Sequence, residues 1–225
     1  MKRVSQKIER YPEGAHEDRK PHDSVETPRL VVVYSDRLAV LAGGLDAEAS
    51  LEARLVDDCA DGDAAAWRRL HRRYYPIAGA FLRKLGVRDR DIEDAAQEVF
   101  LQVHKYLPSF RRESELSTWL YRLCITQARV ARRRARVTDA LRRVLAIAPA
   151  HELVSSHSLA EDAARKRIES ALSALPEGER AVFVLYEMEG LPGKQIAEIV
   201  KCPEATVWRR LHYARQAFRR AIEGE

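Results

Sequence analysis

Residues 196–220 read IAEIVKCPEATVWRRLHYARQAFRR, and this stretch decides how the second half of the chain folds. From residue 205 onward the apolar residues keep to one helix face: Val207, Leu211, Ala214 and Phe218. A shorter apolar helix precedes this one, and Lys201 and Cys202 form the turn between them. Pro203 suits the first turn of the second helix, because a missing N–H costs nothing there. The spacing therefore predicts a helix-turn-helix.

Packing of that face leaves polar, aromatic and basic side chains on the outside of the second helix: Thr206, Trp208, Arg209, Arg210 and Tyr213. In a helix-turn-helix that binds DNA, the second helix enters the major groove and its N-terminal half meets base edges. Arginine pairs bidentately with guanine there, for about 1–3 kcal/mol of discrimination. Arg215 lies further along and is expected to contact DNA as well, most simply at phosphates. The alternative is an ordinary helical hairpin with a basic surface.

A second basic segment, FRRESELSTWLYRLCITQARVARRRAR at residues 110–136, interleaves aromatic rings with arginines. Residues 111–143 hold ten arginines against three acidic residues. Aromatic rings stack on unstacked bases while guanidinium groups hold the backbone, so the pattern is typical of single-strand binding. The candidate residues are Trp119, Tyr121, Arg122, Arg129, Arg132 and Arg133. A solvated helix face with Trp119 in the core is the alternative.

An acidic helix is expected at residues 88–107, RDRDIEDAAQEVFLQVHKYL, which carry Gln97 and Glu98. An acidic helix does not bind DNA. Its acidic first turns either balance the helix dipole or face a protein partner with a basic groove. Composition alone leaves both explanations open.

The composition predicts an all-α fold. The chain is 46% hydrophobic and 32% charged, with no alternating run long enough for a sheet of several strands. We expect two small helical domains on a flexible linker, the C-terminal one containing the helix-turn-helix. The predicted boundaries are a disordered extension at 1–49, a first domain at 50–136, a linker at 137–160 and a second domain at 161–225; within the extension, residues 29–45 are either partly ordered or a partner-binding segment.

Enzymes and membrane proteins do not fit the sequence. It has no paired carboxylates with a plausible site, no Cys/His metal cluster and no glycine-rich phosphate loop, so no catalytic residue, metal or cofactor is expected. The three cysteines are scattered, as in a reducing compartment. The N-terminus has no apolar core for a signal peptide, and the apolar run near residue 35 is too short and polar to span a bilayer. A cytoplasmic protein without membrane insertion is expected.

Two stretches together resemble a known family. DIEDAAQEVFLQVHKYLPSFRRESELSTWLYRL at 91–123 is similar to the second conserved region of bacterial RNA polymerase sigma factors. LPEGERAVFVLYEMEGLPGKQIAEIVKCPEATVWRRLHYARQAFRRAI at 175–222 resembles their fourth region. Two such regions joined by a tether are typical of the extracytoplasmic-function (ECF) group. A stand-alone helix-turn-helix regulator would need neither the acidic helix nor the aromatic and arginine-rich one.

The resemblance implies a non-catalytic subunit that directs promoter recognition and DNA melting. Its partners would be core RNA polymerase, promoter DNA and, as for many relatives, an anti-sigma factor. Polymerase docking would use Asp94, Gln97, Glu98 and Phe100. The −10 element would be held by the helix carrying Trp119, Tyr121, Arg122 and Thr126, and the −35 element read by Thr206, Arg209 and Arg210. Two positions depart from the family: Thr126 replaces a common Asn, and Ala205 replaces a common Gly.

Overall fold

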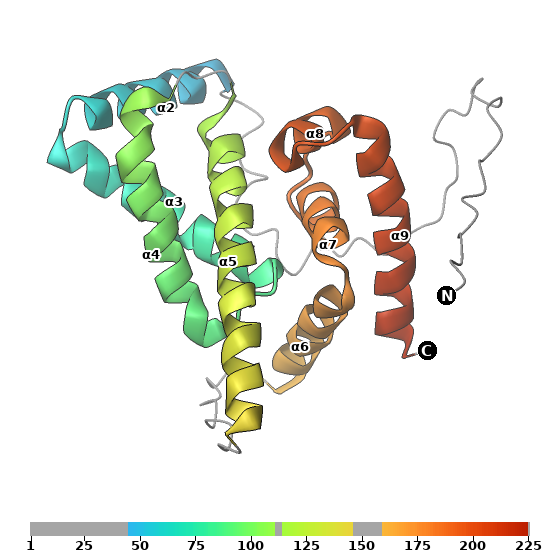
Figure 1. Cartoon of the computed structure of the whole chain (residues 1–225). Helices are drawn as coiled ribbons and strands as arrows, with labels where there is room; N and C mark the ends of the chain where they lie inside the picture. The colour runs from blue at the N-terminus through green and yellow to red at the C-terminus, as the bar shows by residue number, and fades with distance from the viewer. Residues whose placement is uncertain (1–44, 111–113, 146–158, 225) are drawn as a thin grey trace, which may run out of the picture.

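A computed structural model describes residues 45–110, 114–145 and 159–224, all of them in helices or the turns between helices (Figure 1). Within these ranges there is no β-strand, which agrees with the all-α prediction. The predicted N-terminal extension lies outside the described residues except at its end, where residues 45–49 already belong to the first described helix. Most of the predicted linker, residues 146–158, also lies outside them.

The first bundle consists of four helices: α2 (Leu45–Ala60), α3 (Ala64–Lys84), α4 (Asp89–Tyr106) and α5 (Leu116–Val144). A short 3₁₀ turn, η1 (Leu107–Ser109), follows α4. Asp63 begins α3 as predicted, since its Oδ1 accepts a hydrogen bond of 2.7 Å from the N–H of Ala65. Gly86 ends the same helix at a φ of +80°, a conformation that glycine adopts without strain. Buried apolar residues from all four helices form the core, among them Val56, Leu70, Phe81, Val99 and Leu120.

The second bundle consists of α6 (Leu159–Ala174), α7 (Glu177–Phe183), α8 (Gly193–Val200) and α9 (Glu204–Glu223). The π-helical turn η2 (Val184–Met188) continues α7, and its widened ring is closed by the N–H of Glu189 on the carbonyl of Val184 at 3.0 Å. No residue pattern in the sequence indicated this turn.

The helix-turn-helix forms as predicted from α8 and α9. Lys201 ends α8 in the left-handed region at a φ of 52°, which turns the chain sharply. Pro203 is the N-cap of α9, one position before the first turn in which it was expected. The four residues of the predicted apolar face are all buried: Val207, Leu211, Ala214 and Phe218. The opposite face of α9 is therefore left for other contacts.

The helix α5 is longer than the sequence suggests, because it continues through residues 137–144, which were assigned to the linker. An ion pair holds its last turns: Arg88 Nη1 lies 2.9 Å from Asp139 Oδ1. Arginine, alanine and leucine in this segment also favour helix. The end of α5 exposes three apolar residues one turn apart: Val137, Leu141 and Leu145.

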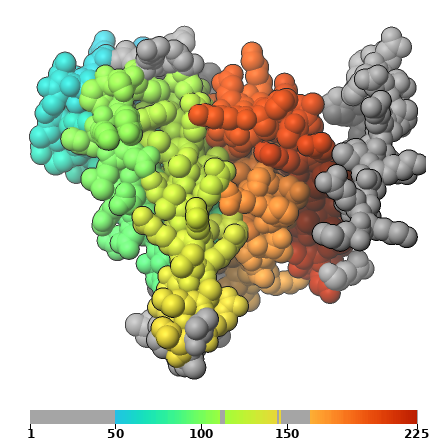
Figure 2. Space-filling model, viewed as in Figure 1, coloured from blue at the N-terminus to red at the C-terminus, as the bar shows by residue number. Residues whose placement is uncertain are grey.

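The two bundles pack against each other along α5 (Figure 1), and the space-filling view shows α5 in continuous contact with the second bundle (Figure 2). Their buried apolar residues form one cluster. Hydrogen bonds and ion pairs also cross between the bundles, and some of them involve Tyr121, Arg129 and Arg132 of α5.

Candidate nucleic-acid interface

The outer face of α9 presents the side chains predicted to read duplex DNA. Trp208 is 43% exposed and Tyr213 is 53% exposed. Arg209 is exposed, and among the described residues it has no hydrogen-bond or ion-pair partner. Thr206 and Arg210 are half-buried. The exposed side of α9 thus offers the guanidinium group of Arg209 and the rings of Trp208 and Tyr213 to solvent on the second helix of a helix-turn-helix, the element that reads base edges.

Trp208 is held in place by η2 and by the start of α8. Its ring packs edge-on against Tyr186 with centroids 5.5 Å apart. Gly193 makes this possible, because a Cβ at that position would lie 2.5 Å from Trp208 Cζ2. The indole is therefore a fixed part of the surface, with one edge packed and the other in solvent.

Two other arginines of α9 are already engaged within the second bundle. Arg215 Nε donates to Glu187 Oε1 at 2.6 Å, and its guanidinium carbon lies 5.4 Å from the centre of the Tyr186 ring. Arg210 Nη1 donates to the Sγ of Cys202 at 3.8 Å, which joins the recognition helix to the turn before it. Arg209 is therefore the candidate for direct base contact that needs the least rearrangement.

The predicted single-strand face of α5 is divided by the fold. Thr126, Arg129 and Arg133 are exposed, whereas Trp119, Arg122 and Arg132 are half-buried. The Trp119 ring packs on Phe110 with centroids 5.2 Å apart. Thr126 donates its hydroxyl to the carbonyl of Arg122 at 3.0 Å, so part of its hydrogen-bonding capacity is used within the helix. The three exposed residues lie in the middle of α5, and the half-buried Trp119 and Arg122 lie nearer its start.

Tyr121 is buried, in contrast to its expected role on an open surface. Its ring packs on Phe81 with centroids 4.5 Å apart, and its hydroxyl donates to Glu189 Oε2 at 2.8 Å. Burial, with the Glu189 carboxylate beside it, raises the pKa of Tyr121 far above its usual range, so the phenol keeps its proton. Tyr121 shares an i, i+3, i+7 face with buried Cys124 and Ala128, which is the sequence signal for its burial.

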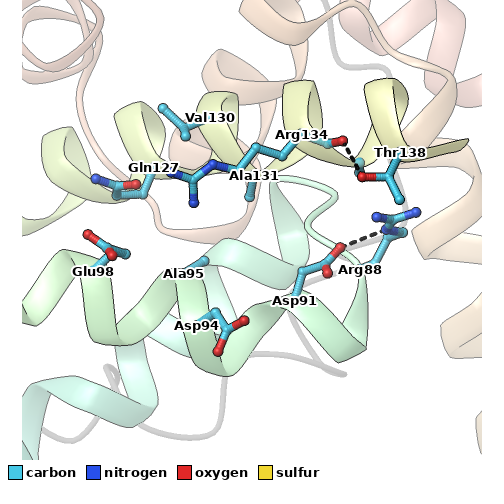
Figure 3. Close-up of a pocket in the computed structure, with 11 residues that line it drawn as sticks. Arg88, Asp91, Asp94, Ala95, Glu98, Gln127, Val130, Ala131, Arg134 and Thr138 are labelled. Atoms are coloured by element: carbon cyan, nitrogen blue, oxygen red, sulfur yellow. Dashed lines mark hydrogen bonds and ion pairs between the residues drawn. The ribbon is translucent and has the colours of Figure 1, made fainter. Parts of the chain in front are cut away.

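The acidic helix α4 lies between two grooves. On one side a cleft of about 120 Å³ separates α4 from α5, and Asp94 and Glu98 line it together with Arg134 (Figure 3). Arg88 closes one end through an ion pair of 2.7 Å with Asp91, and Glu98 and Gln127 lie on facing sides of the cleft (Figure 3). Two of the four predicted docking residues thus belong to a polar cleft.

The other two, Gln97 and Phe100, line an apolar groove of about 500 Å³ between α3 and α4. His71 stacks on Tyr75 with centroids 4.5 Å apart, and it meets Phe100 edge-on at 4.9 Å. The groove also contains Trp67, Arg68, Leu101 and His104. No motif in the sequence connects these residues, although helical spacing places His71 with Tyr75 on α3, and Gln97 with Leu101 and His104 on α4.

Neither a metal site nor a membrane-spanning helix is present among the described residues. In residues 45–110, 114–145 and 159–224, no group of three or more His, Cys, Asp or Glu side chains has a geometry suited to a metal ion. No helix in the same ranges is long and apolar enough to cross a bilayer.

The sequence matches two family models, one in each bundle. Residues 70–138 match Sigma-70 region 2, and residues 165–218 match Sigma-70, region 4. The first match covers parts of α3 and α5 and all of α4, and the second runs from α6 into α9.

Several known proteins are similar in sequence to most of this chain. The ECF RNA polymerase sigma-E factor of Haemophilus influenzae is 31% identical, over 79% of this chain and 98% of that protein. The RNA polymerase sigma-H factor of Pseudomonas aeruginosa is 33% identical, over 76% and 93%. The ECF RNA polymerase sigma-E factor of Escherichia coli K12 is 29% identical, over 75% and 93%.

Solved structures share the fold at lower identity. CnrH, solved in complex with the cytosolic domain of CnrY, superposes with a TM-score of 0.60 at 20% identity, over 77% of this chain and 98% of that one. RpoE of Bartonella quintana, solved in complex with the anti-sigma factor NepR, gives a TM-score of 0.51 at 19% identity, over 69% and 96%.

Proposed function

Because this chain belongs to the extracytoplasmic-function sigma factors of RNA polymerase, which recognise promoters, we propose how its two bundles divide that task. The second bundle reads the −35 element as duplex through α9. The first bundle docks on core polymerase through α4 and holds the separated −10 strand along α5. The polymerase makes the RNA, and this chain supplies specificity in the cytoplasm.

The observation that carries the proposal is the outer face of α9. Arg209 is exposed at the second helix of a helix-turn-helix, with Trp208 and Tyr213 beside it. An arginine in this place can donate two hydrogen bonds to a guanine edge. Other exposed arginines of α9 add phosphate contacts, which raise affinity for every sequence and weaken steeply with salt. Arg215 belongs to that second group, and its bond to Glu187 would exchange for one to phosphate.

Docking on polymerase is proposed for both grooves beside α4. Asp94 and Glu98 supply negative charge on one side, and Phe100 belongs to an aromatic groove on the other, which Gln97 also lines. A basic partner helix with apolar anchors fits such a surface, since apolar anchors give most of the energy and charges give register and rate. Trp67, His71 and Tyr75 are added to the proposed docking residues for the same reason.

Strand holding along α5 is proposed for Trp119, Arg122, Thr126, Arg129, Arg132 and Arg133. Arg122 supports this, because its Nε is buried without a hydrogen-bond partner among the described residues. Such an atom is satisfied when a phosphate or a base oxygen arrives. Tyr121 joins this set only after its hydroxyl leaves Glu189. The module comprises α2 to the end of α5, and the tether begins after Val144.

We also propose a regulatory partner of the anti-sigma class. The similarity to RpoE of Bartonella quintana, which was solved with the anti-sigma factor NepR, supports this. Such a partner would compete with polymerase or DNA for one of the surfaces described above.

Two matched pairs of variants test the proposal with purified core polymerase. Asp94→Arg/Glu98→Arg is expected to abolish co-elution with polymerase, whereas Asp61→Arg/Glu223→Arg makes the same charge change at exposed positions elsewhere and is expected to leave it intact. Arg209→Ala/Arg210→Ala is expected to abolish transcription from a cognate promoter, found by sequencing transcripts after forced expression. Arg54→Ala/Arg72→Ala is its control. Transcription that survives the Arg209→Ala/Arg210→Ala change would show that α9 does not read the −35 element.

A further inference from the structure

The last turns of α5 carry an apolar stripe that no described residue covers. Val137, Leu141 and Leu145 follow one another at intervals of four residues, so they lie on one side of the helix. Their exposed fractions are 62%, 57% and 58%. The helix is regular to its end, since the N–H of Leu145 donates to the carbonyl of Leu141 at 3.0 Å. We call these three residues the α5 stripe. Scattered apolar residues are ordinary on a surface, whereas a contiguous row on one helix face indicates a contact surface.

Arginines surround the α5 stripe. Arg133 lies one turn before Val137 and is exposed. Arg136 and Arg143 are also exposed, and they flank the stripe along the same turns of the helix. The end of α5 is therefore apolar on one side and strongly positive beside it.

The single acidic residue between positions 133 and 145 does not offset this charge. The carboxylate of Asp139 accepts from Arg88 Nη1 at 2.9 and 3.1 Å, and Arg90 Nη2 lies 3.9 Å from its Oδ1. The backbone carbonyl of Asp139 accepts from Arg143 Nε at 3.2 Å. The carboxylate is thus engaged with the start of α4, and the arginines beside the α5 stripe keep their positive charge for a partner.

The shape of this region is convex. Figure 2 shows the last turns of α5 standing out beyond both bundles, and the ribbon in Figure 1 agrees. No residue of the α5 stripe lines the grooves described beside α4. A partner helix typically buries its apolar face in a groove, and the end of α5 offers a single helix instead. A bilayer surface needs no groove, because apolar side chains enter it from a convex surface.

The apolar residues also argue against nucleic acid as the partner of this end of α5. Phosphates attract the arginines, but a row of apolar side chains gains nothing from them. A basic helix with an apolar face is typical of segments that lie on anionic membranes. There the basic side chains meet the lipid headgroups, and the apolar side chains enter the boundary of the acyl chains.

We propose that the last turns of α5 bind the surface of an anionic bilayer, with the α5 stripe at the boundary of the acyl chains and Arg136 and Arg143 paired with lipid phosphates. The inference goes beyond the proposed function, because it concerns the free chain and needs neither polymerase nor promoter. The attachment is peripheral and reversible, since one short stripe and a few arginines form a weak anchor.

The apolar and the charged parts of the contact contribute separately, so each has its own expected effect. An arginine near an anionic surface strengthens binding about fivefold, and the loss of two arginines is expected to weaken it about 30-fold. Removal of one leucine from the acyl-chain boundary is expected to weaken binding about 10-fold.

The test is co-sedimentation of the full chain with vesicles made of phosphatidylglycerol and phosphatidylcholine in equal parts, with pure phosphatidylcholine vesicles as the reference. The unaltered chain is expected to bind only the vesicles that contain phosphatidylglycerol, and to bind them less at high salt. Leu141→Gln is expected to weaken this binding about 10-fold. Its matched control is Leu51→Gln, because Leu51 is 59% exposed on α2, away from the end of α5.

The charged part is tested in the same way. Arg136→Ser/Arg143→Ser is expected to weaken vesicle binding about 30-fold. Arg54→Ser/Arg72→Ser removes two exposed arginines elsewhere in the first bundle and is its control. All of these positions are exposed, so circular dichroism is expected to show the helix content of the unaltered chain in each variant.

Three outcomes overturn the inference. The first is a chain that does not bind the phosphatidylglycerol vesicles. The second is vesicle binding that Leu141→Gln or Arg136→Ser/Arg143→Ser leaves at the level of its control, because another surface then makes the contact. The third is a Leu141→Gln variant that keeps vesicle binding but loses co-elution with core polymerase, which assigns the α5 stripe to a protein partner. None of them bears on the reading of the −35 element by α9, which the transcription assay tests separately.

Discussion

Replacing Arg180 by methionine tests how strongly one buried cation holds α6 and α3 together. Methionine has similar length and no branch, so it fills much of the space but donates no hydrogen bond. The carbonyls of Leu85, Ser173 and Leu175 then lose the Arg180 donor, and each buried acceptor without a partner destabilises the folded state by about 1–3 kcal/mol. Two of these bonds are buried and one is partly buried.

An opposing effect reduces the loss. Burial lowers the pKa of Arg180 from 12.5 to about 10, with Arg132 nearby as a second cause, so the guanidinium remains charged at neutral pH and its desolvation disfavours folding. A shift of that size corresponds to roughly 3 kcal/mol. Methionine removes this penalty, and the net destabilisation expected for Arg180→Met is about 2–4 kcal/mol, near the range seen when one partner of a buried charge is removed.

Urea unfolding followed by circular dichroism measures the effect. The control is Arg167→Met, because Arg167 is an exposed arginine that also donates to a helix-end carbonyl, that of Ile222 at 2.9 Å. For Arg167→Met, the free energy of unfolding is expected to fall by at most about 1 kcal/mol. Arg180→Lys keeps the positive charge but loses the forked set of donors. Its loss of unfolding free energy is expected to lie between those of Arg180→Met and Arg167→Met. If Arg180→Met unfolds at the urea concentration of the Arg167→Met control, the guanidinium is not a structural link and the reasoning fails.

Three further predictions rest on single contacts. Burial raises the pKa of Glu169, whose Oε1 is buried without a hydrogen-bond partner among the described residues, so Glu169→Gln is expected to stabilise the protein at pH 7. Because a folded-state pKa above the unfolded value penalises only the ionised form, that gain must disappear in unfolding curves as pH falls below about 4. Cys202 is half-buried, whereas the other two cysteines are buried. Iodoacetamide is therefore expected to modify Cys202 alone in the native chain, and this modification is expected to weaken duplex promoter binding. Mass spectrometry that finds several modified cysteines would contradict the prediction. Gly193→Ala is expected to displace the Trp208 ring at a cost of about 1–3 kcal/mol and to reduce promoter binding, and unchanged tryptophan fluorescence and affinity would contradict it.

Local sequence rules predicted the parts of the fold that depend on neighbours in the chain. The cap at Asp63, the stop at Gly86 and the buried stripe from Val207 to Phe218 all follow from spacing and residue type. The exposure of Arg209 and Tyr213 follows from the same stripe, because residues off the buried face must point outward. The division of the chain into two helical units was predicted for the same reason.

Contacts between distant segments could not be predicted in this way. Lys84 and Glu189 are separated by 105 positions, and no periodicity links a lysine at the end of one helix to a glutamate after another. Tyr121 was predicted to contact DNA because nothing in the sequence indicates its hydrogen bond to Glu189. Cys124 and Ala128, on the same helix face, did indicate burial. The length of α5 depended likewise on a distant ion pair, between Arg88 and Asp139.

The wide turn η2 sets the orientation of Glu189, which contacts the first bundle. Its five residues, Val184–Met188, lead directly to Glu189, and their widened ring contains one residue more than an ordinary α-helical turn. If the same residues closed with regular α-helical bonds instead, the segment after them would rotate by about 100° relative to α7, and Glu189 would lose its alignment with Lys84. The wide turn therefore sets the orientation at which the second bundle meets the first, without any change in the residues that touch.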